Sequence, residues 1–338
     1  MVRRVLGICT AGAVIAGVLW ASAQVPTPAD ANDIARLVPA DTIALDVTNW
    51  SAIRDALDVP GDQVIARAGA LDLATRSAIL SAGGVVTDDL GWSPAAVGWE
   101  ALIQTPQGSA LLIGLPQSVA KTEARMRDVG YVSDGDLWTI AASDLESGND
   151  RAPEIFANVL VHDSGVAIAA ADPQIVEAVA ATADRKTASL SEADPAARRL
   201  WPRTADLAAW SLHDTDSGCA STDPAESGAD IAAQAEVAVT AAGTPLRPYR
   251  WLLRGLDAPS EHFTVAMAFD SAAHAAEQAG ARAALATGAF IGQRGSVEDS
   301  IDLRAVRTDG NIAVLDFDRK ADAVALMSFN GPLVLASC

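Results

Sequence analysis

The chain has few lysines, cysteines and aromatic residues, and it lacks the short motifs that identify common enzyme classes. Only Lys121, Lys186 and Lys320 are lysines, and 43 acidic residues against 24 basic ones give a formal net charge of −19. This balance argues against nucleic acid and anionic membrane surfaces as general partners, because both repel negative charge. There is no G-x-S-x-G, C-x-x-C, H-E-x-x-H, Walker loop or G-x-G-x-x-G. We therefore expect no recognisable catalytic centre and no cofactor.

Four histidines are the remaining candidates for acid–base chemistry: His162, His213, His262 and His274. His162 and His213 are each followed directly by an aspartate, but adjacent side chains in a strand or helix do not face each other. Adjacency is therefore no evidence of a catalytic pair. An exported hydrolase with a Ser/His/Asp site assembled in space stays open as an alternative.

The N-terminal 23 residues have the three parts of a secretory signal. Arg3 and Arg4 are followed by an uncharged run over residues 5–20, and Ala21-Ser22-Ala23 supplies the small residues that a signal peptidase requires. We expect cleavage before Gln24. Retention of residues 5–23 as a membrane anchor is the alternative, and positive-inside reasoning places the rest of the chain outside the cytoplasm in both cases. The membrane is then contacted only through this segment.

Hydrophobic patterning after a predicted tether (24–33) indicates alternating strands and helices. Ile43, Leu45 and Val47 alternate with polar or small residues, which is typical of a half-buried strand. Asp172 followed by Pro173 is a helix start signal, and Ile175, Val176 and Val179 would form the buried stripe of that helix. Gly130 is expected to end the helix before it in a left-handed conformation. The pattern predicts further strands at 110–115, 155–161, 166–170, 206–212, 262–269, 300–306 and 312–317. It predicts helices at 70–82, 118–129, 271–286 and 318–326, and one that begins at Pro173. A polar loop is expected at 214–228, and the segments 231–242 and 249–256 are ambiguous.

Three features recur in the same order along the chain. Residues 40–45 resemble 205–210, the strand and helix at 111–127 resemble 265–282, and the strand at 165–168 with Asp172 resembles 311–314 with Asp318. Spacings this long indicate duplicated domains, with chance similarity in an Ala/Val-rich chain as the alternative. We expect an α+β fold of antiparallel sheets with helices packed on one face, in two similar halves, 34–195 and 196–338.

The first predicted strand begins with Pro39-Ala40-Asp41-Thr42, and the chain is rich in alanine and prefers arginine over lysine. In these features the chain is similar to a known group of proteins. It resembles uncharacterised exported proteins of GC-rich, actinobacterial type, a family of unknown function. The resemblance implies an exported protein and offers no activity to transfer.

Cysteine arithmetic predicts one disulfide. Cys9 lies inside the apolar N-terminal run, which leaves Cys219 and Cys338 as a pair in an oxidising compartment. Their bond would fix the residue at position 338 to the segment 214–228.

The stretch L-R-P-Y-R-W-L-L-R-G at 246–255 is the best candidate for a ligand or partner surface. Arg247, Arg250 and Arg254 stand without an intervening acid, and in a helix Arg250 and Arg254 would share a face with Trp251 turned to the core. Replacing the three arginines with glutamine should then abolish association with a ligand or the envelope and leave the melting temperature nearly unchanged. The alternative is that the arginines pair with the protein's own carboxylates.

A second candidate, for a metal, lies in the acidic segment that contains Asp214, Asp216, Asp223 and Glu226. Its start resembles a calcium loop, but Gly218 and Ala225 occupy the fifth and twelfth positions where the EF-hand has ligands. An irregular calcium site and a solvated acidic loop both remain open.

These observations favour a non-catalytic, exported protein of the cell envelope that acts by binding a ligand or a protein. A lipid or small-molecule carrier is a further alternative, which an apolar cavity between sheet and helices would favour.

Overall fold

The computed structural model describes residues 31–82, 85–141, 146–147, 150–151, 154–291, 295–321, 323–327 and 333–338. The predicted signal and residues 24–30 of the predicted tether lie outside these ranges. The last residues of that tether, 31–33, form the first turn of helix α1 (Ala31–Ala35). Within the described ranges, every helix is too short or too polar to cross a membrane.

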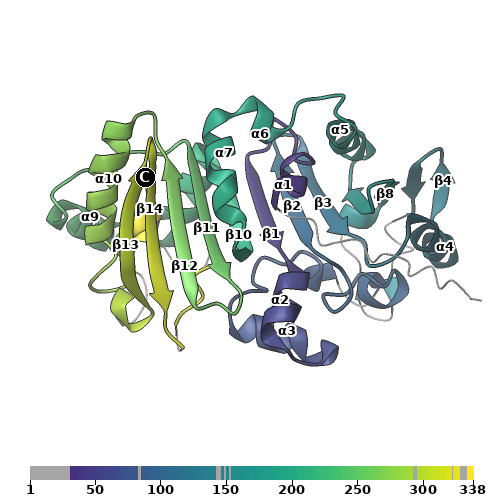
Figure 1. Ribbon diagram of the computed structural model, residues 1–338, viewed down its shortest axis with the longest axis horizontal. Coiled ribbons are helices and arrows are strands. Elements are labelled where there is room, and N and C mark those ends of the chain that lie inside the picture. The colour runs from purple at the N-terminus through teal and green to yellow at the C-terminus, as the bar shows by residue number, and fades with distance from the viewer. Residues whose placement is uncertain are drawn as a thin grey trace, which may run out of the picture.

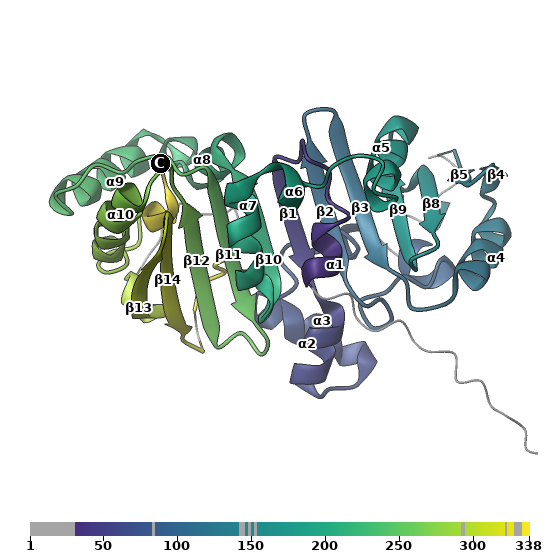
Figure 2. The ribbon, with the colours of Figure 1, turned by 45° about the horizontal axis from the view of Figure 1, so that its top comes forward.

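One antiparallel sheet of twelve strands runs through the molecule (Figures 1 and 2). Its order is β13-β14-β12-β11-β10-β1-β2-β3-β9-β8-β5-β4. The strands β1 and β10 therefore meet at its centre, where Leu45 pairs with Leu212 and Val47 with Trp210. The strands are β1 Ala44–Thr48, β2 Glu100–Thr105, β3 Gly108–Gly114, β4 Val132–Asp134, β5 Leu137–Thr139, β8 Asn158–His162, β9 Val166–Ala170, β10 Leu207–Asp214, β11 Trp251–Asp257, β12 His262–Ala268, β13 Ile301–Asp309 and β14 Ile312–Arg319, with β6 Glu146–Ser147 and β7 Asp150–Arg151 as a separate pair.

The strand order repeats on the two sides of the central pair. Outward from this pair it reads β1-β2-β3-β9-β8, continued by β5 and β4, on one side and β10-β11-β12-β14-β13 on the other. In each half a helix follows the third strand, α4 (Val119–Val129) in the first and α10 (Ala272–Ala284) in the second. The order agrees with the predicted repeat. It does not show a duplication, which stays a prediction, as do the half boundaries at 195 and 196.

The predicted α+β antiparallel class is confirmed, but the helices cover both faces of the sheet and not one face as expected, so the molecule has two cores. One core contains Trp50, Met126 and Ala275, and the other contains Ile34, Val176 and Leu200. The helices of the first core are α2 (Trp50–Leu57), α3 (Gly61–Ala70), α4, α8 (Thr215–Thr222), α9 (Ala229–Ala241) and α10; those of the second are α1, α5 (Pro173–Ala183), α6 (Leu190–Ala193) and α7 (Pro195–Leu200).

The clearest sequence signals correspond to observed elements. Asp172 caps α5 by accepting from the Gln174 amide (2.8 Å), Pro173 begins the helix, and Ile175, Val176 and Val179 are buried. Gly130, predicted after the helix at 118–129, has φ of 110°, the left-handed conformation that glycine adopts without strain.

Three predicted elements were wrong. Residues 70–82 are not a helix, because α3 ends at Ala70 and Asp72 has a left-handed φ of 63°. The helix expected at 318–326 is absent: β14 continues to Arg319, and the described residues of 320–326 are irregular or in turns. The polar loop at 214–228 contains α8, because Asp214 caps it by accepting from the Ser217 amide (2.9 Å). The polar sequence of α8 has no apolar stripe from which a helix could have been predicted.

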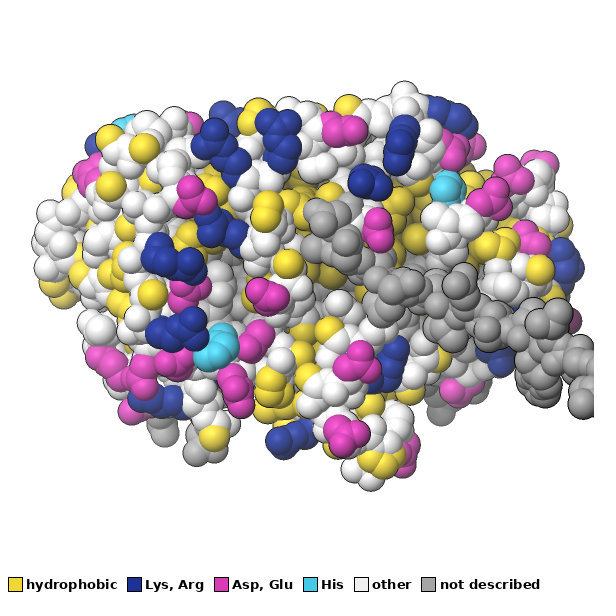
Figure 3. Space-filling view, in the orientation of Figure 1, with side chains coloured by type: hydrophobic (Ala, Val, Ile, Leu, Met, Phe, Trp, Pro, Cys, Tyr) yellow, Lys and Arg dark blue, Asp and Glu magenta, His cyan; other side chains and the backbone are white. Residues whose placement is uncertain are grey.

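The face of β12, β14 and β13 that lies opposite α10 is covered with charged side chains (Figure 3). His262 Nδ1 lies 3.0 Å from Asp318 Oδ1, and Arg304 Nη1 lies 3.7 Å from the same oxygen. Arg307 Nε donates to Asp316 (3.0 Å). Cross-strand ion pairs thus lie on the part of this face that α7, which packs against β11 and β12, does not cover.

Candidate functional site

The arginine stretch forms a strand and not a helix, which corrects the predicted surface. Strand β11 begins at Trp251, and Arg254 is only 2% exposed. Arg254 therefore belongs to the core, and the expectation that all three arginines could be replaced without loss of stability is wrong. Arg247 and Arg250 are about half-exposed and pair with Glu277 (3.3 Å) and Asp194 (3.6 Å). These are the protein's own carboxylates, as the alternative held.

Arg247, Arg250 and Trp251 nevertheless share one pocket of about 660 Å³ with two residues of the predicted calcium set, Asp214 and Asp216. Several polar side chains that line this pocket already form ion pairs or hydrogen bonds within the protein. Asp194 accepts from the Trp251 indole (3.0 Å) and caps α7. Burial alone would raise the pKa of Asp194, but these hydrogen bonds and Arg250 hold it below its ordinary value. The pocket is therefore a polar junction whose charges are largely paired within the protein.

The predicted calcium site is not assembled by the described side chains. Asp214 caps α8, and Asp223 caps the next short helix by accepting from the Ala225 amide (2.8 Å). The side chain of Glu226 lies outside the described residues. Among those that are described, no group of three or more His, Cys, Asp or Glu side chains is arranged to hold a metal ion.

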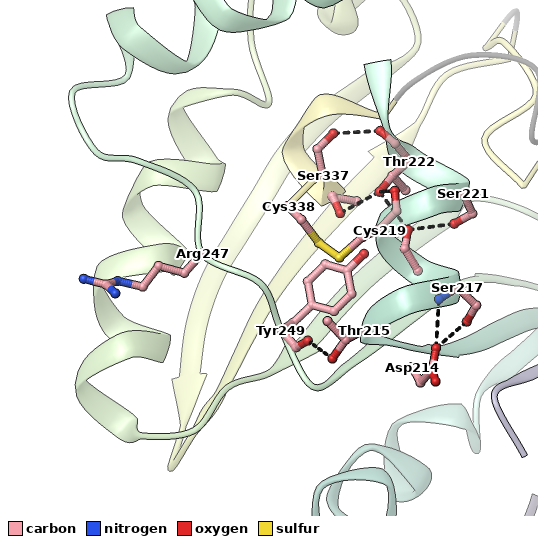
Figure 4. Close-up of a disulfide and its surroundings, with 12 residues drawn as sticks. Asp214, Thr215, Ser217, Cys219, Ser221, Thr222, Arg247, Tyr249, Ser337 and Cys338 are labelled. Atoms are coloured by element: carbon pink, nitrogen blue, oxygen red, sulfur yellow. Dashed lines mark hydrogen bonds between the residues drawn. A yellow bond between two sulfur atoms is a disulfide. The ribbon is translucent and has the colours of Figure 1, made fainter. Parts of the chain in front are cut away.

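The disulfide between Cys219 and Cys338 is confirmed, with the two Cα atoms 5.4 Å apart (Figure 4). It joins α8 to the C-terminal segment. Two further bonds support it: Thr222 Oγ1 donates to the Ala336 carbonyl (3.1 Å), and Ser337 Oγ donates to the Thr222 carbonyl (2.8 Å). The C-terminal segment is thus fixed by covalent and polar contacts to one helix.

Arg282 also holds the C-terminal segment in place. Nothing in the sequence pattern indicated this role. Its guanidinium is buried and donates to the carbonyls of Leu335 (2.9 Å), Ser337 (2.7 Å) and Arg247 (2.9 Å). Burial lowers the pKa of Arg282 to about 10, so the side chain stays charged at neutral pH. A cation inside an Ala-rich helix thereby anchors both the C-terminal segment and the residues before β11.

A second charged cluster lies in the core beneath the central strands. Asp46 Oδ1 is 3.7 Å from His213 Nε2, and Asp46 Oδ2 is 3.7 Å from Arg76 Nη1. Arg254 lies two strands from Asp46, because both residues pair with Ser211 of β10. None of the four is more than 7% exposed. Burial raises the pKa of Asp46, but His213 and Arg76 outweigh it and lower the value. For His213, burial dominates and lowers the pKa. The cluster has no open surface and joins the two halves.

The best candidate for a binding site is a groove beside α9 that no sequence pattern pointed to. Although α9 is rich in alanine and valine, only Ala235 is buried, and Val237 is 70% exposed. The groove has a volume of about 630 Å³. Its lining carries no charged side chain: Ala233, Gln234, Val237, Ala238, Ala241, Ala242, Ala284, Leu285, Thr287, Gly288, Ala289, Ile291 and Val334.

Small side chains keep this groove open. Most lining residues of α9 are alanines, whose methyl groups are too short to fill the space towards α10 and residues 285–291. Val334, from the segment that the disulfide anchors, also lines the groove. In the sequence, 231–242 was ambiguous because alanine and valine suit either a strand or a helix. The exposure of this apolar helix is visible only in three dimensions.

Comparisons with known proteins supply no family. No model of a known protein family matches the chain, and no curated protein sequence matches it. A solved structure described as "Structure of crystal form I of TP0453" aligns with 88% of this chain and 98% of its own, with a TM-score of 0.42 and 8% identity. A likeness at that level carries no argument about function.

Proposed function

We propose that the protein is an exported, non-catalytic binding protein of the cell envelope, and that its ligand is a linear alkyl chain held in the groove beside α9. The observation that carries the proposal is an uncharged groove of about 630 Å³ in a chain with a net charge of −19. Small-molecule sites usually measure about 300–1,000 Å³ and are mostly apolar. The groove has the size and the chemistry of such a site.

The shape of the lining favours an elongated ligand. On α9 the lining residues fall at 233–234, 237–238 and 241–242, three successive turns of one face. At a rise of about 1.5 Å per residue, this face is roughly 13 Å long. Gln234 and Thr287 contribute the polar side chains of the lining. A hydrocarbon chain fits such a surface, with its polar end outside the groove.

Export is supported by two independent features. Residues 1–23 have the pattern of a secretory signal. The Cys219–Cys338 bond belongs to a class that persists in oxidising compartments and is rare in the cytosol. Both agree with a protein that meets alkyl-chain ligands outside the cytoplasm.

The test is titration of the mature chain with a fluorescent polyene fatty acid, whose emission rises in apolar surroundings. Val237→Glu places a charge in the groove at a side chain that is 70% exposed. We expect affinity to fall at least about tenfold, because a carboxylate must be desolvated beside the chain. The melting temperature should not change, because Val237 packs little.

Val132→Glu is the matched control. Val132 is 69% exposed and lies on β4, at the opposite end of the sheet (Figure 2). This variant should bind the probe like the parent. Equal binding by Val237→Glu, or equal loss in both variants, would contradict the proposal. A dimer that Val237→Glu dissociates would instead identify the groove as a contact between copies.

A further inference from the structure

The C-terminal segment, residues 333–338, lines the groove beside α9 and also carries one half of the disulfide. Val334 belongs to the groove lining, and Cys338, at the other end of the segment, is bonded to Cys219. Between them the chain forms a buried 3₁₀ turn, Val334–Ala336. The segment therefore runs from the groove wall to the disulfide through one packed turn, and the place of Val334 depends on how the segment is held.

The other half of the disulfide belongs to the helix that leads into α9. Cys219 lies on α8 (Figure 4), and residues 223–228 connect α8 to α9. Both α9 and Val334 line the groove, together with residues 284–291. One covalent bond thus ties the C-terminal segment to the part of the chain that supplies the helical wall of the groove.

Noncovalent contacts keep the segment attached when the disulfide is open. Arg282 donates to the carbonyls of Leu335 (2.9 Å) and Ser337 (2.7 Å). Thr222 Oγ1 donates to the Ala336 carbonyl (3.1 Å). Such bonds can break and re-form while the rest of the fold stays intact. Opening of the disulfide therefore permits an equilibrium between an attached and a detached segment, which the closed bond suppresses.

The disulfide is accessible from its Cys338 side. Cys338 is an exposed residue, whereas Cys219 is partly buried in α8. A thiol that approaches from solvent therefore meets the Cys338 sulfur first. Exposed disulfides are more labile than buried structural ones, and regulatory disulfides are found among them. The location of this bond suits exchange with an external dithiol.

We propose that the Cys219–Cys338 bond is a redox switch for the groove: the disulfide form binds the alkyl chain, and a dithiol oxidoreductase weakens binding by reducing the bond. The switch rests on the function proposed for the groove. A thiolate of the oxidoreductase attacks Cys338 Sγ, the bond between the two sulfurs breaks, and Cys219 leaves as a thiolate that takes up a proton. The second thiol of the oxidoreductase loses its proton and displaces Cys338, which is protonated in turn. Two electrons pass to this chain, and the oxidoreductase becomes a disulfide.

Ligand binding and reduction oppose each other by the same factor. An alkyl chain in the groove contacts Val334 only while the segment is attached, so binding favours the attached state. By linkage, the factor by which reduction weakens binding equals the factor by which the ligand disfavours reduction. Couplings of this kind usually amount to about 5- to 150-fold. We expect a value near the lower end, because Val334 is one residue of a long lining.

The experiment titrates the mature chain with the fluorescent polyene fatty acid before and after reduction by dithiothreitol. We expect the dissociation constant to rise at least about fivefold on reduction and to recover when oxidised glutathione re-forms the bond. In a buffer of reduced and oxidised dithiothreitol, saturating probe should raise the ratio of disulfide to dithiol protein by the same factor. Equal affinity of the two forms, or a bond that dithiothreitol does not reduce in the folded chain, would overturn the proposal.

Two variants test whether the effect passes through the bond and the segment. The paired Cys219→Ser and Cys338→Ser exchange should bind like the reduced parent and should not respond to dithiothreitol. Val334→Ala, with the disulfide intact, should diminish the effect of reduction, because the segment then contributes less to the groove. A response to dithiothreitol in the cysteine-free variant, or an undiminished effect in Val334→Ala, would contradict the switch. Far-UV circular dichroism should not change on reduction, and unfolding would mean that the bond serves the fold alone.

A measurement without ligand separates this switch from the function on which it rests. Reduction should quicken hydrogen exchange in residues 333–338 and in α9 more than in α5. If the oxidised chain does not bind the probe, the proposed function fails, and exchange alone then decides whether the bond controls the groove wall. Unchanged exchange in α9 on reduction would count against the switch in either case.

Discussion

The two halves of the sheet use the same insertion point in opposite ways. Between its first and second strands, the first half inserts α2 and α3, and the second inserts α8 and α9, on the same face of the sheet. In the first insertion Trp50, Ile53 and Val64 are completely buried. In the second, α9 buries only Ala235. Large side chains fill the core in one half, and small ones leave a groove in the other.

The opposite face differs between the halves as well. In the first half α5 follows β9 and covers the sheet. In the second half the described residues after β14 include no such helix. The preceding helix α7 packs against β11 and β12, and ion pairs lie on the rest of this face of β12, β14 and β13 (Figure 3). The face of β12, β14 and β13 that is not covered by a helix thus carries charged side chains. The exposed surface of α9, in contrast, is apolar. That contrast singles out the groove.

The largest expected effect on stability comes from removing one large buried side chain of the first insertion. Trp50→Ala removes a fully buried indole whose Nε1 donates to Glu100 (2.8 Å), and it should lower the free energy of unfolding by about 3–5 kcal/mol. Val237→Ala, in the second insertion, should change it by less than about 0.5 kcal/mol. Urea denaturation of both variants checks the comparison. Similar losses in the two variants would mean that α9 is part of the core.

Loss of the disulfide should affect the second half next most strongly. The paired Cys219→Ser and Cys338→Ser exchange should lower the free energy of unfolding by about 2–4 kcal/mol, since it frees a loop closed over 119 residues. Hydrogen exchange should then quicken in α8 and the C-terminal segment before it does in α5. In the parent, two thiols that react with an alkylating agent under unfolding, non-reducing conditions would rule out the bond.

Replacing Arg282 should loosen the same segment without touching the disulfide. Arg282→Met leaves the carbonyls of Leu335, Ser337 and Arg247 without their donor, and we expect a loss of about 2–3 kcal/mol. Arg247→Met removes only a half-exposed ion pair with Glu277 and should lose less than about 1 kcal/mol. Thermal unfolding of the two variants distinguishes them. Equal shifts would show that the three carbonyl bonds do not anchor the segment.

The smallest effect is a pH dependence at the junction of the halves. Burial holds the pKa of His213 below 6.5, so below pH 6.5 the unfolded chain binds more protons than the folded one. Stability is therefore complete above about pH 6.5 and falls with acidification, by at most about 1.4 kcal/mol per pH unit. The slope should flatten in His213→Gln. Glu100, whose pKa burial raises, acts in the opposite direction in both proteins, so the difference between parent and variant reports His213 together with its partner Asp46. Identical slopes would exclude the effect.

Local signals in the sequence were sufficient for part of the fold. The cap at Asp172, the stripe of Ile175, Val176 and Val179, and the pairing of Cys219 with Cys338 each depend on few residues and were predicted. The strand β1 was identified because its apolar and polar residues alternate, but the expectation that it is half-buried was wrong, since Asp46 and Thr48 are buried as well. Residues 249–256 were ambiguous because both faces of β11 are buried, so the polar face that marks a half-buried strand is absent.

The candidate site could not be predicted, because it depends on distances between segments. The groove exists only because α9 stands apart from α10 and residues 285–291, and Val334 lines it only because the fold brings the C-terminal segment there. The arginine surface failed for a related reason. Charge suggested an exposed position for Arg254, but the sheet places it in the core, where Ser211 of β10 lies between it and Asp46. Composition indicates which residues are unusual and not where the fold takes them.

The central pair of strands decides how the chain can be divided. In the whole protein β1 and β10 cover each other's hydrogen-bonding edges. Expressed separately, each half would present a bare edge strand, the kind of template on which chains aggregate. During synthesis, β1 must also wait for β10 to emerge before its edge is covered. The interval between them is thus the period in which the nascent chain most needs protection.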